Sequence, residues 1–172
     1  IFLLICAQGF IGWYMVMSGL VNKVDVSHFR LSLHLTTAFI ILTLILWQIF
    51  NLKIKLNSNY GYIKFKLPEF FIFLTFLQII VGAFVSGMDA GKIYNSWPLM
   101  GSTFFPNDNS LYNLFKISAF SEPSLVQFMH RNLAYIIMSV YLISLYLIIS
   151  NKLIKFNTVS YTHLRAHETL LD

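Results

Sequence analysis

Two histidines lie inside long apolar stretches of this chain, where an ionisable side chain is costly and usually has a function. His34 lies about one helical turn into the stretch that begins near Arg30, and His130 about two turns into the stretch that begins near Ser124. At about 1.5 Å rise per residue, both imidazoles are expected roughly 5 to 10 Å below the same membrane boundary. Imidazoles within a helical bundle ligate metals or relay protons.

Cationic and small residues accompany both histidines. Arg30 precedes His34 by four residues and therefore lies on the same helix face, and Arg131 adjoins His130. Small residues occur in the segments 8–12 and 78–82, where helices or a macrocycle can approach closely. A haem site needs an axial ligand, an open face of small residues and cations for the propionates. The pattern is therefore compatible with haem binding, with Arg30 and Arg131 as candidates for propionate pairing.

Other interpretations use the same residue types. A membrane histidine can simply hydrogen-bond a neighbouring helix, small residues can serve only helix packing, and an arginine can reach lipid phosphate. A proton relay or a transporter site also requires buried histidines. The chemistry of these residues alone leaves the haem, proton-transfer and structural interpretations open.

The two histidine-bearing segments share a weak internal similarity. In each, a glutamine lies four residues before a glycine, Ser-Gly follows at the outer end, and a loop leads to the helix with the histidine. This order favours a parallel repeat, although the two loops differ greatly in length.

The elements that must position these residues follow from composition. Of the 172 residues, 57% are hydrophobic and 11% are charged, against roughly 45–50% and about 25% in soluble proteins. Four apolar stretches are long enough to cross a hydrocarbon core of about 30 Å as helices. They run over residues 1–20, 30–50, 68–87 and 124–150. The sequence thus predicts an all-α, polytopic membrane helical bundle.

The basic residues set the predicted orientation. The net charge is +5, but the lysines lie in short segments between apolar runs and form no single stripe, so we expect no nucleic-acid partner. Lysines are concentrated in the loop 51–67 and after residue 150, which places these ends on the cytoplasmic or matrix side. The long loop 88–123 is nearly neutral and is expected on the outer side. The single cysteine, Cys6, excludes an intrachain disulfide.

Longer motifs resemble a known family. The string QGFIGWYMVMSGL at residues 8–20, followed by VSHFRLSLHL at 26–35, resembles the middle helices of the haem A synthase family. The string GAFVSGMDAGKIYNSWPLMG at 82–101 resembles its outer-loop signature, and VQFMHR at 126–131 resembles its haem-ligand helix. The form is closest to the proteobacterial and mitochondrial branch.

The resemblance implies a fold of eight transmembrane helices in two four-helix halves, each holding a haem between two histidines. Residues 1–50 would be the last two helices of the N-terminal half, 51–67 a cytoplasmic or matrix-side loop, and 68–156 the first two helices of the C-terminal half. His34 would be the axial ligand of the substrate haem and His130 that of the cofactor haem. The second ligands and a functional glutamate would lie on helices outside this segment, so we expect an internal fragment that is inactive alone.

The implied function is that of an oxidoreductase. Members of the family oxidise the C8 methyl of haem O to the formyl of haem A for cytochrome c oxidase assembly, with haem b as cofactor. The expected surroundings are the lipid bilayer of a bacterial plasma membrane or a mitochondrial inner membrane, with haem O synthase and an electron donor as partners. Asp89, Tyr94 and Asn95 are expected to fold the outer loop over the haem edge. The alternative is a non-catalytic b-type cytochrome electron carrier, which would place its histidines at opposite depths.

Residues 157–172 differ in character from the rest of the chain. This polar segment does not continue the membrane pattern and resembles translated sequencing-adapter read-through, so we interpret it as an artefact outside the family. The alternative is a solvated loop that leads to another helix. His163 and His167, four residues apart, are not taken as a metal pair because they lack a third ligand.

Overall fold

The protein is all-α in the part of the chain that the computed structural model describes, residues 1–19, 26–53 and 67–150. The described elements, in chain order, are α1 (Phe2–Gly19), α2 (His28–Lys53), α3 (Leu67–Gly87), the 3-10 helices η1 (Ala90–Lys92), η2 (Leu111–Phe115) and η3 (Ile117–Ser121), and α4 (Pro123–Ser150). The four α-helices match the predicted apolar stretches to within a few residues, which confirms the predicted fold class. The loop 54–66 and the segment 157–172 lie outside the described residues, and the predictions for them are not tested.

Local sequence explains the ends of α3 and α4. Pro123 is the first residue of α4, where its missing N–H costs nothing because that donor would have no partner within the helix. Pro68 similarly lies in the first turn of α3, next to Glu69, whose negative charge favours a helix N-terminus. At its other end α3 stops at Gly87, and the chain turns through Asp89, which has a left-handed backbone conformation (φ 52°).

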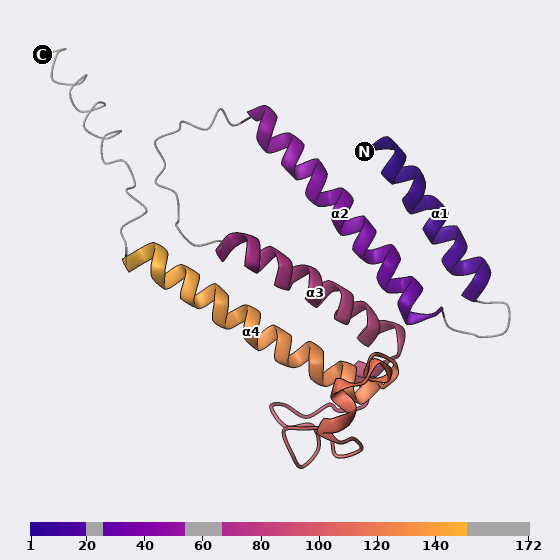
Figure 1. Ribbon diagram of the computed structural model, residues 1–172, viewed down its shortest axis with the longest axis vertical. Coiled ribbons are helices and arrows are strands. Elements are labelled where there is room, and N and C mark those ends of the chain that lie inside the picture. Colours follow the sequence, from indigo (N-terminus) through magenta and orange to yellow (C-terminus); the bar gives the residue numbers. More distant parts are fainter. Residues whose placement is uncertain (20–25, 54–66, 151–172) are drawn as a thin grey trace, which may run out of the picture.

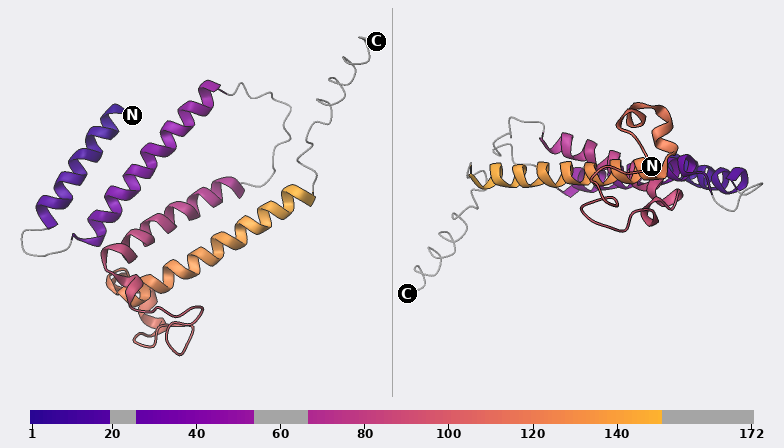
Figure 2. Two further views of the ribbon diagram at one scale, coloured as in Figure 1. Left: turned by 180° about the vertical axis from the view of Figure 1, so that it is seen from behind. Right: turned by 90° about the horizontal axis from the view of Figure 1, so that it is seen from below.

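The helices form two hairpins that lie side by side. In Figure 1, α1 runs antiparallel to α2, and α3 runs antiparallel to α4. The views of Figure 2 agree, and the view from below shows that the four α-helices lie close to one plane. α2 and α3 approach each other at the end that carries the η1–η3 segment and diverge toward the other end. The α2–α3 contact therefore joins the hairpins near the end that carries η1–η3, which is the end predicted to face the outer side.

A glycine permits this close approach. A Cβ built at Gly87 would lie 2.9 Å from both Cα and Cβ of His28, a distance that real Cβ atoms do not adopt. Farther along the same contact, the Ser32 hydroxyl is within 3.4 Å of the Ile80 carbonyl, to which it donates. The aromatic ring of Phe84 lies edge-on to the ring of His28. The two hairpins are thus packed backbone to backbone at Gly87.

Apolar side chains cover the outward faces of the helices. Leu3 is 79% exposed, Trp47 65% and Tyr146 69%, and many aliphatic and aromatic neighbours are exposed with them. Among residues 1–19, 26–53 and 67–150, three helices are long and apolar enough to span a membrane, over His28–Asn51, Glu69–Gly87 and Pro123–Leu147. Phe2–Ser18 is a shorter apolar helix. Such faces require lipid or further helices as their environment. The chain is therefore a multi-pass membrane protein. The lysines on which the predicted orientation depends lie mostly outside the described residues.

Replacing Gly87 tests the junction between the hairpins. We expect Gly87→Ala to lower the free energy of unfolding of the full-length protein by about 1–3 kcal/mol, the usual cost of overpacking. The control is Gly9→Ala, because a Cβ at Gly9 would meet nothing within 4 Å. Thermal melting in detergent is the measurement, and equal melting temperatures for the two variants would contradict the close contact.

Candidate haem-ligand sites

His34 lies against α1, in contact with a glutamine and a glycine. It is six residues after the first residue of α2. The side-chain nitrogen of Gln8 donates to the backbone carbonyl of His34 at 2.9 Å and lies 3.2 Å from Nδ1 and 3.4 Å from Nε2 of its ring. A Cβ at Gly12 would lie 3.0 Å from ring atom Cε1. The half-buried imidazole therefore fits against a helix face formed by Gln8 and Gly12.

His130 has the same surroundings in the second hairpin. It is seven residues after the first residue of α4 and faces α3. The side-chain nitrogen of Gln78 lies 3.3 Å from Nε2 of the ring and also donates to the backbone carbonyl of His130 at 3.3 Å. A Cβ at Gly82 would lie 3.1 Å from Cε1. The other ring nitrogen, Nδ1, is buried and has no hydrogen-bond partner.

The two sites are structurally equivalent. In both, the ring carbon between the two nitrogens faces a glycine, and the amide comes from the residue four positions before that glycine. Residues four apart lie on one helix face, so each pair forms a single surface. The first helices of the hairpins thus present matching faces to the histidines of the second helices. This correspondence goes further than the weak similarity of the two sequence segments.

The two arginines have different environments. The Arg30 guanidinium lies over the Tyr14 ring, 5.3 Å from its centroid. The Arg131 guanidinium donates to the backbone carbonyls of Tyr94 and Ser96 at 2.7 and 2.8 Å. A guanidinium has five N–H donors, so these two bonds leave others for an anion. Pairing with propionates stays a prediction for both side chains.

The outer loop between α3 and α4 is held down by polar side chains of α4. Gln127 donates to the Tyr94 carbonyl at 2.9 Å, and the Trp97 ring nitrogen donates to the Tyr135 hydroxyl at 2.7 Å. A face of α4 next to His130 is therefore occupied by the loop. Nothing in the sequence indicated these contacts, because their partners in the irregular loop precede them by about 33–38 residues.

Tyr94 and Asp108 organise the loop itself. The Tyr94 hydroxyl donates to the Asp108 carboxylate at 3.0 Å. Partial burial and this hydrogen bond raise the pKa of the Tyr94 phenol above its ordinary value. Tyr94 therefore stays protonated near neutral pH and acts as a donor. Asp89 is exposed and pairs with Lys92 at 2.8 Å, on the surface of the loop.

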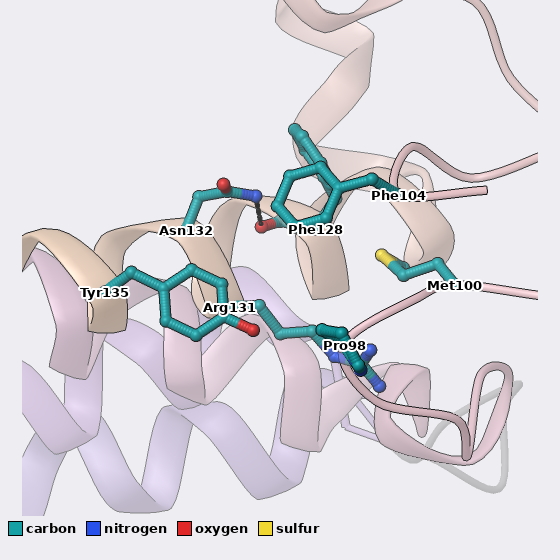
Figure 3. Close-up of a pocket in the computed structure, with 7 residues that line it drawn as sticks. All are labelled: Pro98, Met100, Phe104, Phe128, Arg131, Asn132 and Tyr135. Atoms are coloured by element: carbon teal, nitrogen blue, oxygen red, sulfur yellow. Dashed lines mark hydrogen bonds between the residues drawn. The ribbon is translucent and has the colours of Figure 1, made fainter.

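Figure 3 shows a small hollow between the loop and α4. Pro98 and Met100 from the loop lie opposite Phe128 and Arg131 of α4. The hollow holds about 0 Å³ of space for a water-sized molecule, far below the roughly 300 Å³ at which ligand pockets begin. Neither His34 nor His130 lines it. The hollow is therefore a feature of loop packing and belongs to neither histidine site.

Haem iron fits the donor chemistry of both sites. A neutral imidazole is a common axial ligand, and the unpartnered Nδ1 of His130 shows that its ring has hydrogen-bonding or coordinating capacity left over. Each glycine leaves room for its ring, because a Cβ at Gly12 or Gly82 would lie only 3.0 or 3.1 Å from ring carbon Cε1. Within the described ranges, no three His, Cys, Asp or Glu side chains gather into a metal-binding group.

These features define a class: a helical membrane protein in which each hairpin carries one histidine against a Gln-x-x-x-Gly face. Comparison with known proteins identifies the family within this class of membrane protein. The COX15-CtaA family, described as cytochrome oxidase assembly protein, matches residues 1–166, and the chain belongs to that family. This confirms the resemblance that the sequence motifs indicated.

Individual relatives agree. The chain is 52% identical over 143 residues to the protein named heme A synthase of Pelagibacter ubique (strain HTCC1062), an alignment that covers 80% of this chain and 41% of the relative. It is 39% identical over 163 residues to the heme A synthase of Rickettsia africae (strain ESF-5), covering 92% and 48%. The chain thus spans less than half the length of these relatives. No solved structure matches it.

Gly82 offers a test of the support beneath His130. In Gly82→Ala the new methyl would force the ring to move by a few tenths of an ångström. We expect the haem content of the full-length protein to fall while helix content, measured by circular dichroism, is retained. Gly9→Ala is the control, and unchanged haem content in Gly82→Ala would show that the glycine does not set the ring position.

Arg131 offers a test of the loop. Arg131→Lys removes the pair of guanidinium hydrogen bonds to the Tyr94 and Ser96 carbonyls. Each hydrogen bond of this charged type contributes about 1.5–3 kcal/mol to stability. Amide hydrogen exchange in residues 94–100 should accelerate. Arg30→Lys serves as the comparison and should leave exchange there as it was. Equal rates in all three proteins would contradict an anchoring role for Arg131.

Proposed function

We propose that this chain is the central part of a haem A synthase, an oxidoreductase that converts the C8 methyl group of haem O to the formyl group of haem A. The observation that carries the proposal is the equivalence of the two histidine sites, one in each hairpin and both near the outer end. Membership of the COX15-CtaA family and the names of the relatives support it.

The two histidines take different roles in this proposal. His34 holds the macrocycle of the substrate haem O, and His130 holds the cofactor haem b. When bound, haem b supplies electron-transfer chemistry at the second site. Each histidine is kept in orientation by the neighbouring helix of its own hairpin, through Gly12 for His34 and Gly82 for His130. A fixed ring direction defines where the reacting edge of the substrate lies.

The cationic side chains and the outer loop complete the sites. Arg30 and Arg131 pair with propionates through charge-assisted hydrogen bonds. Arg131 also anchors the outer loop, so propionate binding and loop closure share one side chain. The loop anchored by Gln127 and Trp97 covers the outer end of α4 and excludes water from the site beneath it.

The depth of the two histidines argues for this function over a transmembrane electron carrier. Both rings lie six or seven residues from helix starts at the same end of the molecule. A carrier that moves electrons across the bilayer needs haems at different depths. We further propose haem O synthase and an electron donor as partners. The membrane is a bacterial plasma membrane or a mitochondrial inner membrane, and the bacterial relatives favour the former.

Histidine replacement in the full-length protein tests the two roles separately. His130→Gly should lose the cofactor haem, seen in the reduced-minus-oxidised spectrum. His34→Gly should keep that haem but form no haem A. Added imidazole should restore haem binding to His130→Gly, which a general folding defect would not permit. Normal haem content in His130→Gly, or normal haem A output from His34→Gly, would refute the assignment.

A further inference from the structure

We propose that Gln8 and Gln78 are positioning residues that orient the axial histidines and set the hydrogen bonding of their rings. This inference rests on the proposed function, because it concerns how the two histidines present themselves to iron. It assigns a role to two side chains that the sequence motifs alone left as parts of small-residue segments.

In each hairpin one glutamine amide nitrogen donates to the backbone carbonyl of the histidine and also lies within hydrogen-bond distance of its ring. For His34 the amide is near both ring nitrogens, and for His130 it is near Nε2. The distances are 2.9 and 3.2 Å for Gln8 with His34, and 3.3 Å for both contacts of Gln78 with His130. The carbonyl contact fixes where the amide lies, and the ring contact fixes where the imidazole lies relative to it. The glycine one turn further along lies beside ring carbon Cε1.

An imidazole that binds a metal through one nitrogen presents an N–H at the other, and that N–H needs an acceptor. The carbonyl oxygens of both glutamines, Oε1, are buried and have no hydrogen-bond partner. An amide carries a donor and an acceptor on one planar group, so a half turn of the amide would present Oε1 to a ring N–H in exchange for the bond to the histidine carbonyl. Each glutamine can therefore accept a hydrogen bond from the ring of an iron-bound histidine, but it does not keep both contacts at once.

The competing explanation is a purely structural hydrogen bond between helices. Glutamine side chains join neighbouring membrane helices in this way, and the gain in helix association is usually small. Such a role would affect helix association and would leave the electronic properties of a bound haem unchanged. An amide–imidazole contact recurs in two separate hairpins, to Nδ1 and Nε2 of His34 and to Nε2 of His130. This recurrence favours the positioning role, because helix association alone needs no ring contact.

The test uses the full-length, haem-loaded protein with Gln78→Met and Gln78→Glu. Methionine keeps the volume but removes donor and acceptor. We expect haem affinity to fall by about 10–100-fold, as is usual when a partner of a ligating histidine is lost, and the midpoint potential of the haem to rise. Glutamate supplies a stronger acceptor to the ring N–H, which makes the ligand more basic, so the midpoint potential should fall below that of the unaltered protein.

Two controls make the outcome specific. Gln48 lies on α2 with an exposed side chain, so Gln48→Met should change neither haem affinity nor midpoint potential. Gln8→Met should weaken the binding of haem O and leave the spectrum and potential of the haem on His130 as they were. If Gln78→Met does not accumulate in the membrane, the haem midpoint potential of Gln78→Glu alone tests the positioning role of Gln78.

The results separate this inference from the proposed function. If His130→Gly keeps its haem, the proposed function fails. If His130→Gly loses haem, but Gln78→Met and Gln78→Glu keep the potential of the unaltered protein, the positioning role is overturned while the proposed function stands. A lower melting temperature with an unchanged potential would likewise assign Gln78 to helix packing only.

Discussion

In both hairpins the position of a histidine ring is set by its contact with a glycine on the neighbouring helix. At Gly12 and at Gly82 the absence of a Cβ lets the ring carbon of a histidine approach the helix backbone. Close approach in turn brings an amide within reach of the ring and of the histidine carbonyl. In a membrane interior, where polar groups have few partners, these contacts give each ring a defined direction.

The fourth helix shows how this constraint connects to the outer surface. One face of α4 directs His130 toward α3, while the neighbouring residue Arg131 reaches the carbonyls of the outer loop. Successive residues on a helix point in different directions, so His130 contacts α3 while Arg131 contacts the loop from the same helical turn. The position of the loop and the position of the ring are therefore set by the same short segment. The loop that Arg131 binds and the site around His130 are therefore structurally connected.

The sequence predicted the helices well and the contacts between them only in part. Hydropathy and length located all four α-helices, because the cost of unpaired backbone groups in lipid leaves few alternatives. His34 and His130 stood out because ionisable groups are rare in such stretches. The partners Gln8 and Gln78 were visible only as neighbours of glycine, since their role depends on the register between two helices. The loop contacts of Arg131 could not be predicted, because an irregular loop has no periodicity to extrapolate.

We propose that the imidazoles of His34 and His130 both bind haem iron at the same end of the helical bundle. A cryo-electron microscopy structure of the full-length protein purified with its haems tests it most directly. We expect iron within coordination distance of a ring nitrogen of His34 and of His130, with Gln8 and Gln78 beside the same rings. Rings that point toward lipid, or macrocycles held by other side chains, would contradict it.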